Sequence, residues 1–256
     1  MTSPWIAHRV QKPAARVRLL CFPHAGAGAS VFRPWTRAAD ETLDVCPVQL
    51  PGRETRWGEP PIDRVEPLVD ALCDAVAPCI EDRYALFGCS MGAVVAFELA
   101  RALRRRSLPS PSHLFVAARR APTRLDRRAP IHHLSDAELV RRIGAYAGTP
   151  AEILASADVM SLYLPAIRAD FTLCETYVCQ PGPLLDCPVN VFGGHLDSEV
   201  TPDDLAAWRD VTVSSCRVQM FDEGHLFLHS QQSVLLDTIA SELWRTDATP
   251  ERVAVA

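Results

Sequence analysis

The sequence has no apolar run approaching the ~18 uninterrupted residues of a transmembrane helix, and none of its nine cysteines forms a C-x-x-C pair. The first absence argues against a membrane-spanning segment. The amino-terminal stretch 1–18 also lacks the apolar core of a signal peptide, so we expect a cytoplasmic protein. Because cysteines stay reduced in that compartment, the sequence predicts free thiols rather than a disulfide framework.

The cysteines give little support to a metal centre. The nearest approach to a cluster is formed by Cys174, Cys179 and Cys187, whose spacings match no common zinc module. We therefore expect that the chain itself holds no metal ion and no cofactor.

The chain also lacks a net positive charge. The 256 residues carry a formal net charge of −5 and have a pI of about 5.9, which argues against a dedicated nucleic-acid-binding protein. The chain is 48% hydrophobic and 22% charged. That balance is typical of a globular protein and excludes a disordered one.

The basic residues are unevenly spread. Between Arg101 and Arg142 there are eleven arginines and three acidic residues, a local excess of eight positive charges. Codon usage explains this simply, because Lys12 is the only lysine among the 26 basic residues. A docking face for an acidic partner is the second interpretation.

Short apolar segments bounded by turn residues predict buried strands. They lie at residues 17–22, 44–50, 84–87, 113–118, 187–192 and 217–221. Helical spacing and capping residues predict helices. These lie at 65–80, at 91–106, after capping boxes at Ser135 and Thr149, at 158–177 with an interruption at Pro165, after Thr201, and at 230–244.

The alternation of strands and helices predicts an α/β fold, with a mostly parallel sheet wrapped by helices. We expect one domain over residues 1–256. Within it, the strand-free block at about 125–180 is expected to form a helical lid over the carboxyl ends of the strands.

A Gly88-x-Ser90-x-Gly92 motif falls between a predicted strand and a predicted helix. A nucleophile elbow is a strained turn at such a place, with a serine at its tip and glycines on either side that avoid Cβ clashes. The alternative is a plain glycine-flanked turn with an N-capping serine. The apolar segments before and after the motif favour the elbow, with Ser90 as nucleophile and Cys89 only as its neighbour.

A serine nucleophile needs a base, and the base needs an acid to orient it. His225 follows the last predicted strand and is our candidate base. Asp197 follows strand 187–192 and is the candidate acid, with Asp126 as the fallback. The chain order Ser90, Asp197, His225 is that of α/β-hydrolases.

The developing oxyanion needs two backbone N–H groups. We expect one from Met91, directly after the nucleophile, and one from Ala25, in the loop after the first strand. The same loop resembles a dinucleotide-binding fingerprint, Gly26-x-Gly28-x-x-Val31. Since Val31 stands where glycine or alanine is required, a nicotinamide enzyme is disfavoured.

Five motifs follow one another: Phe22-Pro-His-Ala-Gly26, Leu50-Pro-Gly-Arg53, Gly88-x-Ser-Met-Gly92, Leu164-Pro-x-x-Arg168-Ala-Asp170 and Gly224-His225. In this order, over roughly residues 17–245, the chain resembles the type II thioesterases of modular polyketide synthases and nonribosomal peptide synthetases. Such enzymes are α/β-hydrolases that remove stalled or misprimed acyl groups from the phosphopantetheine thiol of carrier domains. The chain departs from the family at Cys89, where histidine is usual.

The resemblance implies that Ser90, Asp197 and His225 act as nucleophile, orienting acid and base. It implies acyl or peptidyl carrier domains as partners, with phosphopantetheine as part of the substrate and neither nucleic acid nor membrane involved. It also strengthens the docking interpretation of the basic stretch, for which we single out three residues: Arg104, Arg105 and Arg106.

Apolar residues of the predicted lid are candidates for the wall of an acyl chamber, with helix packing onto the sheet as the alternative. They are Leu154, Met160, Leu162, Tyr163, Leu164, Ile167 and Phe171. Two other functions stay open from the sequence. One is a carboxylesterase or lipase acting on free esters, and the other is a non-hydrolytic scaffold that binds carrier domains.

Overall fold

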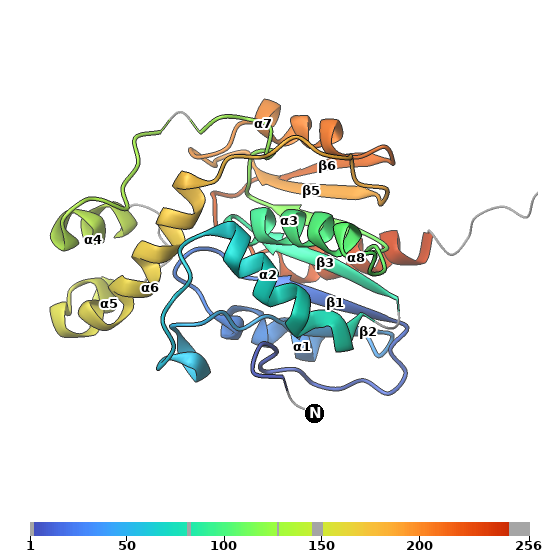
Figure 1. Cartoon of the computed structure of the whole chain (residues 1–256), viewed down its shortest axis with the longest axis horizontal. Helices are drawn as coiled ribbons and strands as arrows, with labels where there is room; N and C mark the ends of the chain where they lie inside the picture. Colours follow the sequence, from blue (N-terminus) through green and yellow to red (C-terminus); the bar gives the residue numbers. More distant parts are fainter. Residues whose placement is uncertain (1–2, 81–82, 127, 145–150, 246–256) are drawn as a thin grey trace, which may run out of the picture.

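The computed structural model describes residues 3–80, 83–126, 128–144 and 151–245. Its centre is a six-stranded sheet in the order β2-β1-β3-β4-β5-β6, in which all neighbouring strands are parallel (Figure 1). The strands are β1 (Val17–Phe22), β2 (Leu43–Pro47), β3 (Tyr84–Cys89), β4 (Leu114–Ala117), β5 (Val189–Gly194) and β6 (Cys216–Phe221). The predicted α/β fold is confirmed.

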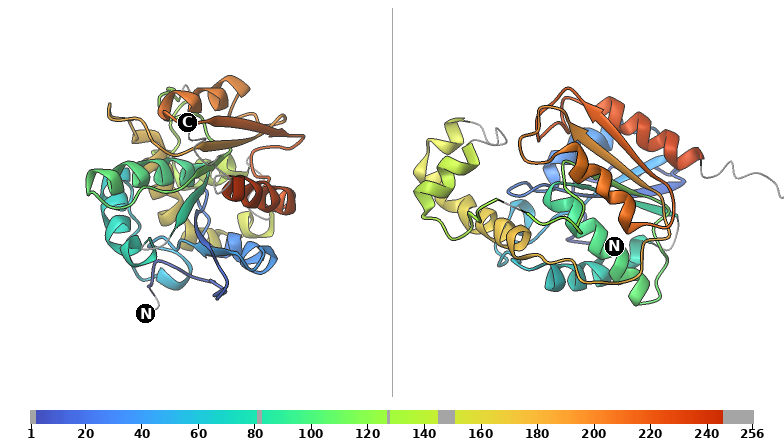
Figure 2. Two further views of the ribbon diagram at one scale, coloured as in Figure 1. Left: turned by 90° about the vertical axis from the view of Figure 1, so that its right-hand side faces the viewer. Right: turned by 90° about the horizontal axis from the view of Figure 1, so that it is seen from above.

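Helices cover both faces of the sheet (Figures 1 and 2). On one face α2 (Val65–Val76) and α3 (Met91–Arg105) lie side by side, and on the other α1 (Arg33–Ala38) contacts α8 (Gln232–Arg245). A short helix, α7 (Pro202–Ala206), follows β5 and begins with the capping box predicted at Thr201.

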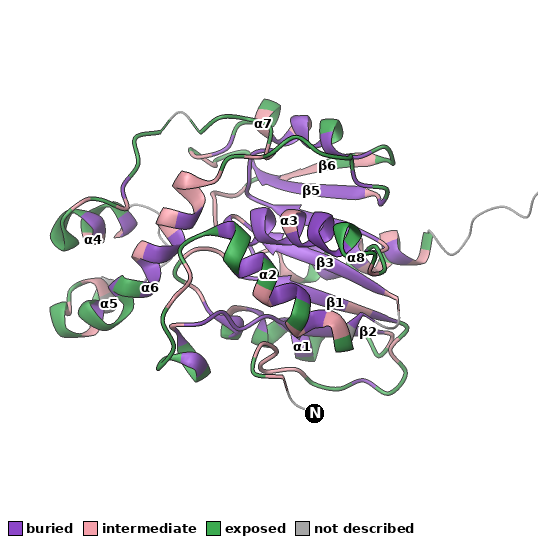
Figure 3. Ribbon diagram, in the orientation of Figure 1, coloured by how far each residue is buried: buried purple, intermediate pink, exposed green. Residues whose placement is uncertain are grey.

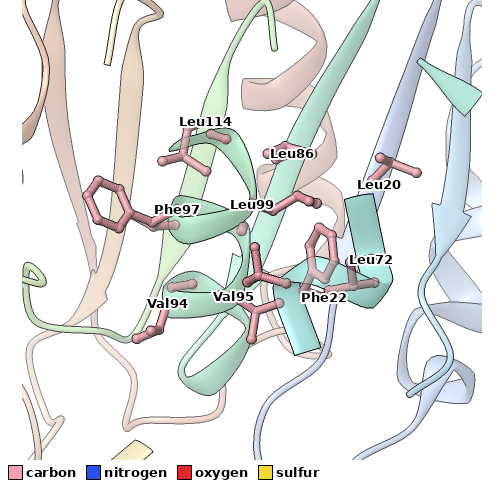
Figure 4. Packing of buried hydrophobic residues seen from close by; sticks show 14 of the residues in the cluster. Leu20, Phe22, Leu72, Leu86, Val94, Val95, Phe97, Leu99 and Leu114 are labelled. Carbon is pink, nitrogen blue, oxygen red and sulfur yellow. The ribbon is translucent and has the colours of Figure 1, made fainter. Parts of the chain in front are cut away.

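Burial explains why the central strands are almost wholly apolar. Every residue of β3, β4 and β5 is buried, whereas the edge strand β6 is largely accessible (Figure 3). Strands covered on both faces have no polar side to present. Between the sheet and helices α2 and α3, fully enclosed side chains interlock (Figure 4): Leu20, Leu72, Leu86, Val95, Leu99 and Leu114. Each contributes roughly 1.5–3 kcal/mol by leaving water.

Three helices are inserted between β4 and β5, at one end of the sheet (Figures 1 and 2). They are α4 (Asp136–Gly144), α5 (Ala151–Leu154) and α6 (Ala157–Thr176). A small apolar cluster of their own joins them to one another. The predicted capping box at Ser135 starts α4, since the Glu138 N–H donates to Ser135 Oγ over 3.4 Å. The second predicted box, at Thr149, lies outside the described residues.

Helix α6 corrects one prediction, because it continues through Pro165. Proline lacks an N–H, so the carbonyl of Ser161 loses its helical partner. Ser161 is exposed, where water can donate to that carbonyl. The cost is offset by burial of Met160, Ile167 and Leu173 on the inner side of the helix.

Two element ends differ from the predictions. Helix α2 stops at Val76 rather than Ile80, and the following turn is a 3₁₀ helix that contains Pro78. Strand β2 stops at Pro47 rather than continuing to residue 50, since Val48 turns to form an antiparallel bridge with Ile6. Of the helices in the described ranges, none has both the length and the apolar character needed to cross a bilayer.

Candidate active site

Ser90 lies at a sharp turn between β3 and α3. Its backbone has φ 50° and ψ −110°, a conformation that residues other than glycine rarely adopt. The turn is close enough that a Cβ at Gly88 would lie 2.2 Å from the Gly92 carbonyl oxygen, and a Cβ at Gly92 would lie 2.1 Å from that of Phe22. Only glycine fits on either side, which is the geometry of a nucleophile elbow.

His225 connects this serine to an aspartate. Its Nε2 lies 3.0 Å from Ser90 Oγ and its Nδ1 lies 2.8 Å from Asp197 Oδ2. A carboxylate only accepts, so Nδ1 donates to Asp197 and Nε2 is left to accept from the serine hydroxyl. The structure thus brings the three predicted side chains together from the ends of β3, β5 and β6.

Asp197 is fixed in place. Its side chain is 1% exposed, and its second oxygen, Oδ1, accepts the Glu199 N–H over 2.7 Å. The fallback acid, Asp126, is engaged elsewhere in an ion pair of 2.7 Å with Arg128. In the structure it is therefore Asp197, and not Asp126, that contacts His225.

The loop after β1 passes next to the serine. The Gly26 N–H donates to Asp170 Oδ2 over 2.7 Å and the Ala27 N–H donates to the His24 carbonyl over 3.1 Å. Of the three consecutive amides 25–27, within the described residues, these two are committed to other partners, whereas Ala25 lines the cavity beside Ser90. The Met91 N–H belongs to the first turn of α3, where amides have no helical acceptor.

A buried ion pair holds this loop against the inserted helices. Arg53 donates to both oxygens of Asp170 on α6, at 2.5 and 2.8 Å, and also to the Ala27 carbonyl over 3.2 Å. The two side chains are 5% and 1% exposed. Both residues belong to motifs quoted above, but the sequence assigned them no role because nothing in it shows that positions 53 and 170 meet.

Cys89, directly before Ser90, is buried, and His24, which lines the same cavity as Ser90, is half-buried. Burial raises the pKa of the Cys89 thiol well above its usual range, and the nearby Asp197 carboxylate adds to the shift. The thiol therefore stays protonated, and since only a thiolate is an effective nucleophile, Cys89 does not compete with Ser90 for the substrate. Burial lowers the pKa of His24, although its contact with the Ala25 carbonyl opposes this, so His24 is neutral near pH 7.

Ser90 and His225 open into a cavity of about 900 Å³ between the sheet and the inserted helices. Four of the predicted chamber residues line it: Met160, Tyr163, Ile167 and Phe171. The other three do not, within the part of the chain that the structure describes. Leu154 and Leu164 pack inside the insertion's own cluster, and Leu162 is 56% exposed.

The structure does not place the predicted docking arginines at this cavity. Arg106 pairs with Asp70 and Asp74 on α2, and Arg104 donates to the Leu184 carbonyl. They lie at the far end of α3, about 20 Å from Ser90 at 1.5 Å per residue. This position gives the docking interpretation of Arg104, Arg105 and Arg106 no support, and that interpretation stays a prediction. In the described ranges no group of three or more His, Cys, Asp or Glu residues is arranged to hold a metal ion.

A parallel sheet with a strained serine before α3, and a histidine and an aspartate on later loops, defines a serine hydrolase of the α/β-hydrolase class. A thioesterase domain model matches residues 17–243. The chain belongs to the thioesterase family, and it is a hydrolase of acyl thioesters.

Its relatives include biosynthetic thioesterases. The gramicidin S biosynthesis protein GrsT of Aneurinibacillus migulanus is 36% identical over 239 residues, 93% of either chain. The type II thioesterase BorB from the borrelidin biosynthetic cluster has a TM-score of 0.86 and 37% identity, covering 93% of this chain and 97% of that one. The RedJ thioesterase from the prodiginine pathway in Streptomyces coelicolor has a TM-score of 0.85 and 41% identity, covering 91% and 92%.

Proposed function

We propose that this chain is an editing thioesterase. It hydrolyses aberrant or stalled acyl groups from the phosphopantetheine arm of carrier domains in polyketide or nonribosomal peptide biosynthesis, and it works in the cytoplasm where those carriers are. The observation that carries the proposal is the contact of Ser90, His225 and Asp197 at the wall of a 900 Å³ cavity. Relatives named for such pathways, among them GrsT, BorB and RedJ, support the substrate class.

In the first half of the reaction, Ser90 Oγ attacks the thioester carbonyl carbon while His225 Nε2 takes the hydroxyl proton. Asp197 stabilises the imidazolium that forms. The N–H groups of Ala25 and Met91 donate to the oxyanion of the tetrahedral intermediate. When the carbon–sulfur bond breaks, His225 returns the proton to the pantetheine sulfur, which leaves as a thiol.

In the second half, a water molecule attacks the acyl-enzyme and gives its proton to His225. The second tetrahedral intermediate breaks its bond to Ser90 Oγ, and the proton from His225 restores the serine hydroxyl. One water is consumed, and the products are a carboxylic acid and a free carrier thiol. Acyl chains would occupy the space bounded by Met160, Ile167 and Phe171, whose apolar side chains match a hydrocarbon chain.

The substrate class is tested by presenting one acyl chain in two forms. A butyryl group is offered on a phosphopantetheinylated carrier domain and as its p-nitrophenyl ester, and mass spectrometry of the carrier is compared with nitrophenol release. We expect a higher kcat/KM for the carrier thioester. A strong preference for the oxoester would indicate a carboxylesterase, and no turnover of either substrate would indicate a scaffold that binds carriers.

A further inference from the structure

The Ala25 amide, which we propose as an oxyanion donor, is both free to donate and fixed in direction. It donates to no acceptor in the described part of the chain, and Ala25 lines the cavity that contains Ser90. The carbonyl of the same peptide group, that of His24, accepts the Ala27 N–H over 3.1 Å. Because the C=O and N–H of a trans peptide point in opposite directions, this bond turns the Ala25 N–H away from Ala27.

The next peptide group, between Ala25 and Gly26, is held at both ends. Its carbonyl oxygen lies 3.0 Å from His24 Nδ1, and its N–H donates to Asp170 Oδ2 over 2.7 Å. Since a carbonyl oxygen only accepts, His24 Nδ1 carries a hydrogen and donates it. Gly26 has φ 79°, and a glycine adds little stiffness to a backbone, so the contacts of the two side chains are what hold this part of the loop.

The His24 contact acts directly on the Ala25 amide. The bond from Nδ1–H to the Ala25 carbonyl closes a ring of atoms that contains the His24–Ala25 peptide bond. The two torsions that orient the Ala25 N–H, ψ of His24 and φ of Ala25, lie inside this ring and are restricted by it. Asp170 holds only the following peptide group, so His24 is the side chain that restrains the direction of this amide.

His24 has a single hydrogen to donate. Burial lowers the pKa of its ring; the contact with the Ala25 carbonyl opposes this, and the positive charge that His225 can carry adds to the lowering. A neutral imidazole has one N–H, and the Ala25 carbonyl accepts it. The ring therefore has no hydrogen left for the oxyanion or for the leaving sulfur, and it acts through the loop.

We propose that the Nδ1–H of His24 positions the Ala25 amide for the oxyanion of the tetrahedral intermediate. His24 is thus a positioning residue of the oxyanion hole rather than a catalytic residue. The inference rests on the proposed function, because it concerns the thioester that Ser90 attacks.

Three variants separate the two ring nitrogens. His24→Asn keeps an N–H donor at the same number of bonds from the backbone as Nδ1, His24→Gln moves the donor to the ε position, and His24→Phe keeps a ring without a donor. Loss of an oxyanion donor lowers kcat about 100- to 1000-fold, and a displaced donor should cost part of that. We expect kcat/KM for butyryl-pantetheine to fall about 10- to 100-fold in His24→Gln and His24→Phe, and to stay within about fivefold of the wild type in His24→Asn.

Two inhibitors show whether the oxyanion hole is what changes. A trifluoromethyl ketone on a pantetheine arm accepts Ser90 Oγ at its carbonyl carbon and forms an oxyanion, whereas the amide analogue of butyryl-pantetheine binds without reacting. In His24→Phe, the Ki of the ketone should rise by about the factor by which kcat/KM falls, and the Ki of the amide should stay unchanged. An equal rise in both would mean that His24 only supports the cavity, and would overturn the inference.

His8→Gln is the matched control, because His8 lines the same cavity but contacts Glu54; its kcat/KM should equal that of the wild type. Heteronuclear NMR of the isotopically labelled wild type should show the Nδ1–H tautomer of His24 near pH 7, and this result does not depend on whether the variants fold. The inference is overturned by the Nε2–H tautomer, by rescue in His24→Gln instead of His24→Asn, or by wild-type rates in His24→Phe. If the wild type hydrolyses neither butyryl-pantetheine nor a butyryl-carrier domain, the proposed function itself is refuted.

Discussion

At the scale of single residues, the backbone around Ser90 does as much as its side chains. The positive φ at Ser90 is tolerated because glycines flank it, and the resulting turn points the hydroxyl at His225 Nε2. Cys89 points the other way, into the apolar cluster under α1 and α8. Adjacent residues of one turn thus have opposite surroundings, and only one of them can react.

Cys89→Ala should retain activity, because a buried protonated thiol takes no part in the reaction. We expect kcat/KM within about twofold of the wild type and a loss of about 1 kcal/mol in the free energy of unfolding, from the small void left behind. Steady-state hydrolysis of an acyl-pantetheine and urea denaturation measure the two. A loss of activity as complete as in Ser90→Ala would give Cys89 a catalytic role.

The motif at Ser90 is the part of the site that the sequence predicts best. Gly88 is required by a contact within the motif itself, with the Gly92 carbonyl, so the pattern carries that part of the geometry; Gly92 in addition lies against the Phe22 carbonyl of β1. The roles of Asp197 and His225 follow from chain order in the same way. Asp170 is different, because its partner Arg53 is 117 residues away and their meeting depends on how the insertion folds back over the sheet.

At the scale of elements, helix α6 and the loop after β1 form one unit. Asp170 accepts from the Gly26 N–H and holds Arg53, which in turn holds the Ala27 carbonyl. The loop that carries the Ala25 amide is thus positioned by a helix of the insertion, and a shift of α6 would move the amide that we propose as an oxyanion donor.

Asp170→Asn should reduce both activity and stability. Arg53 would stay buried without its acid, at a cost of about 3–5 kcal/mol, and displacement of the loop should lower kcat about 10- to 100-fold with a smaller effect on KM. The double variant Arg53→Met, Asp170→Leu removes both charges and should recover much of the stability. It should not recover kcat, since the Gly26 N–H has lost its acceptor. A double variant with wild-type kcat would contradict this positioning role.

A second buried polar contact, besides the Arg53–Asp170 pair, joins His113, directly before β4, to Asn190 of β5. The ring nitrogen Nε2 lies 2.7 Å from Asn190 Oδ1, and the ring stacks on Phe115. Burial lowers the pKa of His113 to about 4, although the Asn190 contact opposes the shift. The folded state therefore binds this proton less readily than the unfolded chain, where histidine titrates near 6.5.

It follows that part of the stability at neutral pH is lost as the pH falls from about 6.5 towards 4. The contribution of His113 should amount to about 2 kcal/mol between pH 7 and pH 5. His24, whose pKa is also lowered, acts in the same direction, so the variant His113→Gln is needed to separate the two. Urea denaturation at both pH values should show a smaller pH dependence in His113→Gln. An equal dependence would mean that His113 is not neutral in the folded protein.

At the scale of the whole molecule, the catalytic groups and the cavity lie at one end of the sheet and the basic end of α3 at the other. The sequence predicted the fold well because the strands are short, apolar and separated by capped helices. It did not show that Leu154, Leu162 and Leu164 lie outside the cavity lining, since helical spacing does not show which way a side chain faces. The predicted interruption of the helix at Pro165 was wrong because burial along α6 outweighs the loss of one backbone hydrogen bond.

The position of Arg104, Arg105 and Arg106 leads to a prediction opposite to the one made from charge alone. Reversing all three to glutamate should lower turnover of an acyl-carrier domain and of an acyl-pantetheine by the same small factor. The ratio of the two kcat/KM values is the measurement. A selective loss on the carrier substrate would restore this end of α3 as a docking face.

The central claim is that the Ser90 hydroxyl, activated by His225, takes the acyl group from the thioester. Rapid quenching of the enzyme with a butyryl-carrier domain, followed by mass spectrometry of proteolytic peptides, tests it most directly. The account predicts a transient butyryl group on Ser90 in the wild type, no such group in Ser90→Ala, and turnover reduced at least about 1000-fold in that variant. Retained turnover in Ser90→Ala, or an acyl group on Cys89 instead, would contradict it.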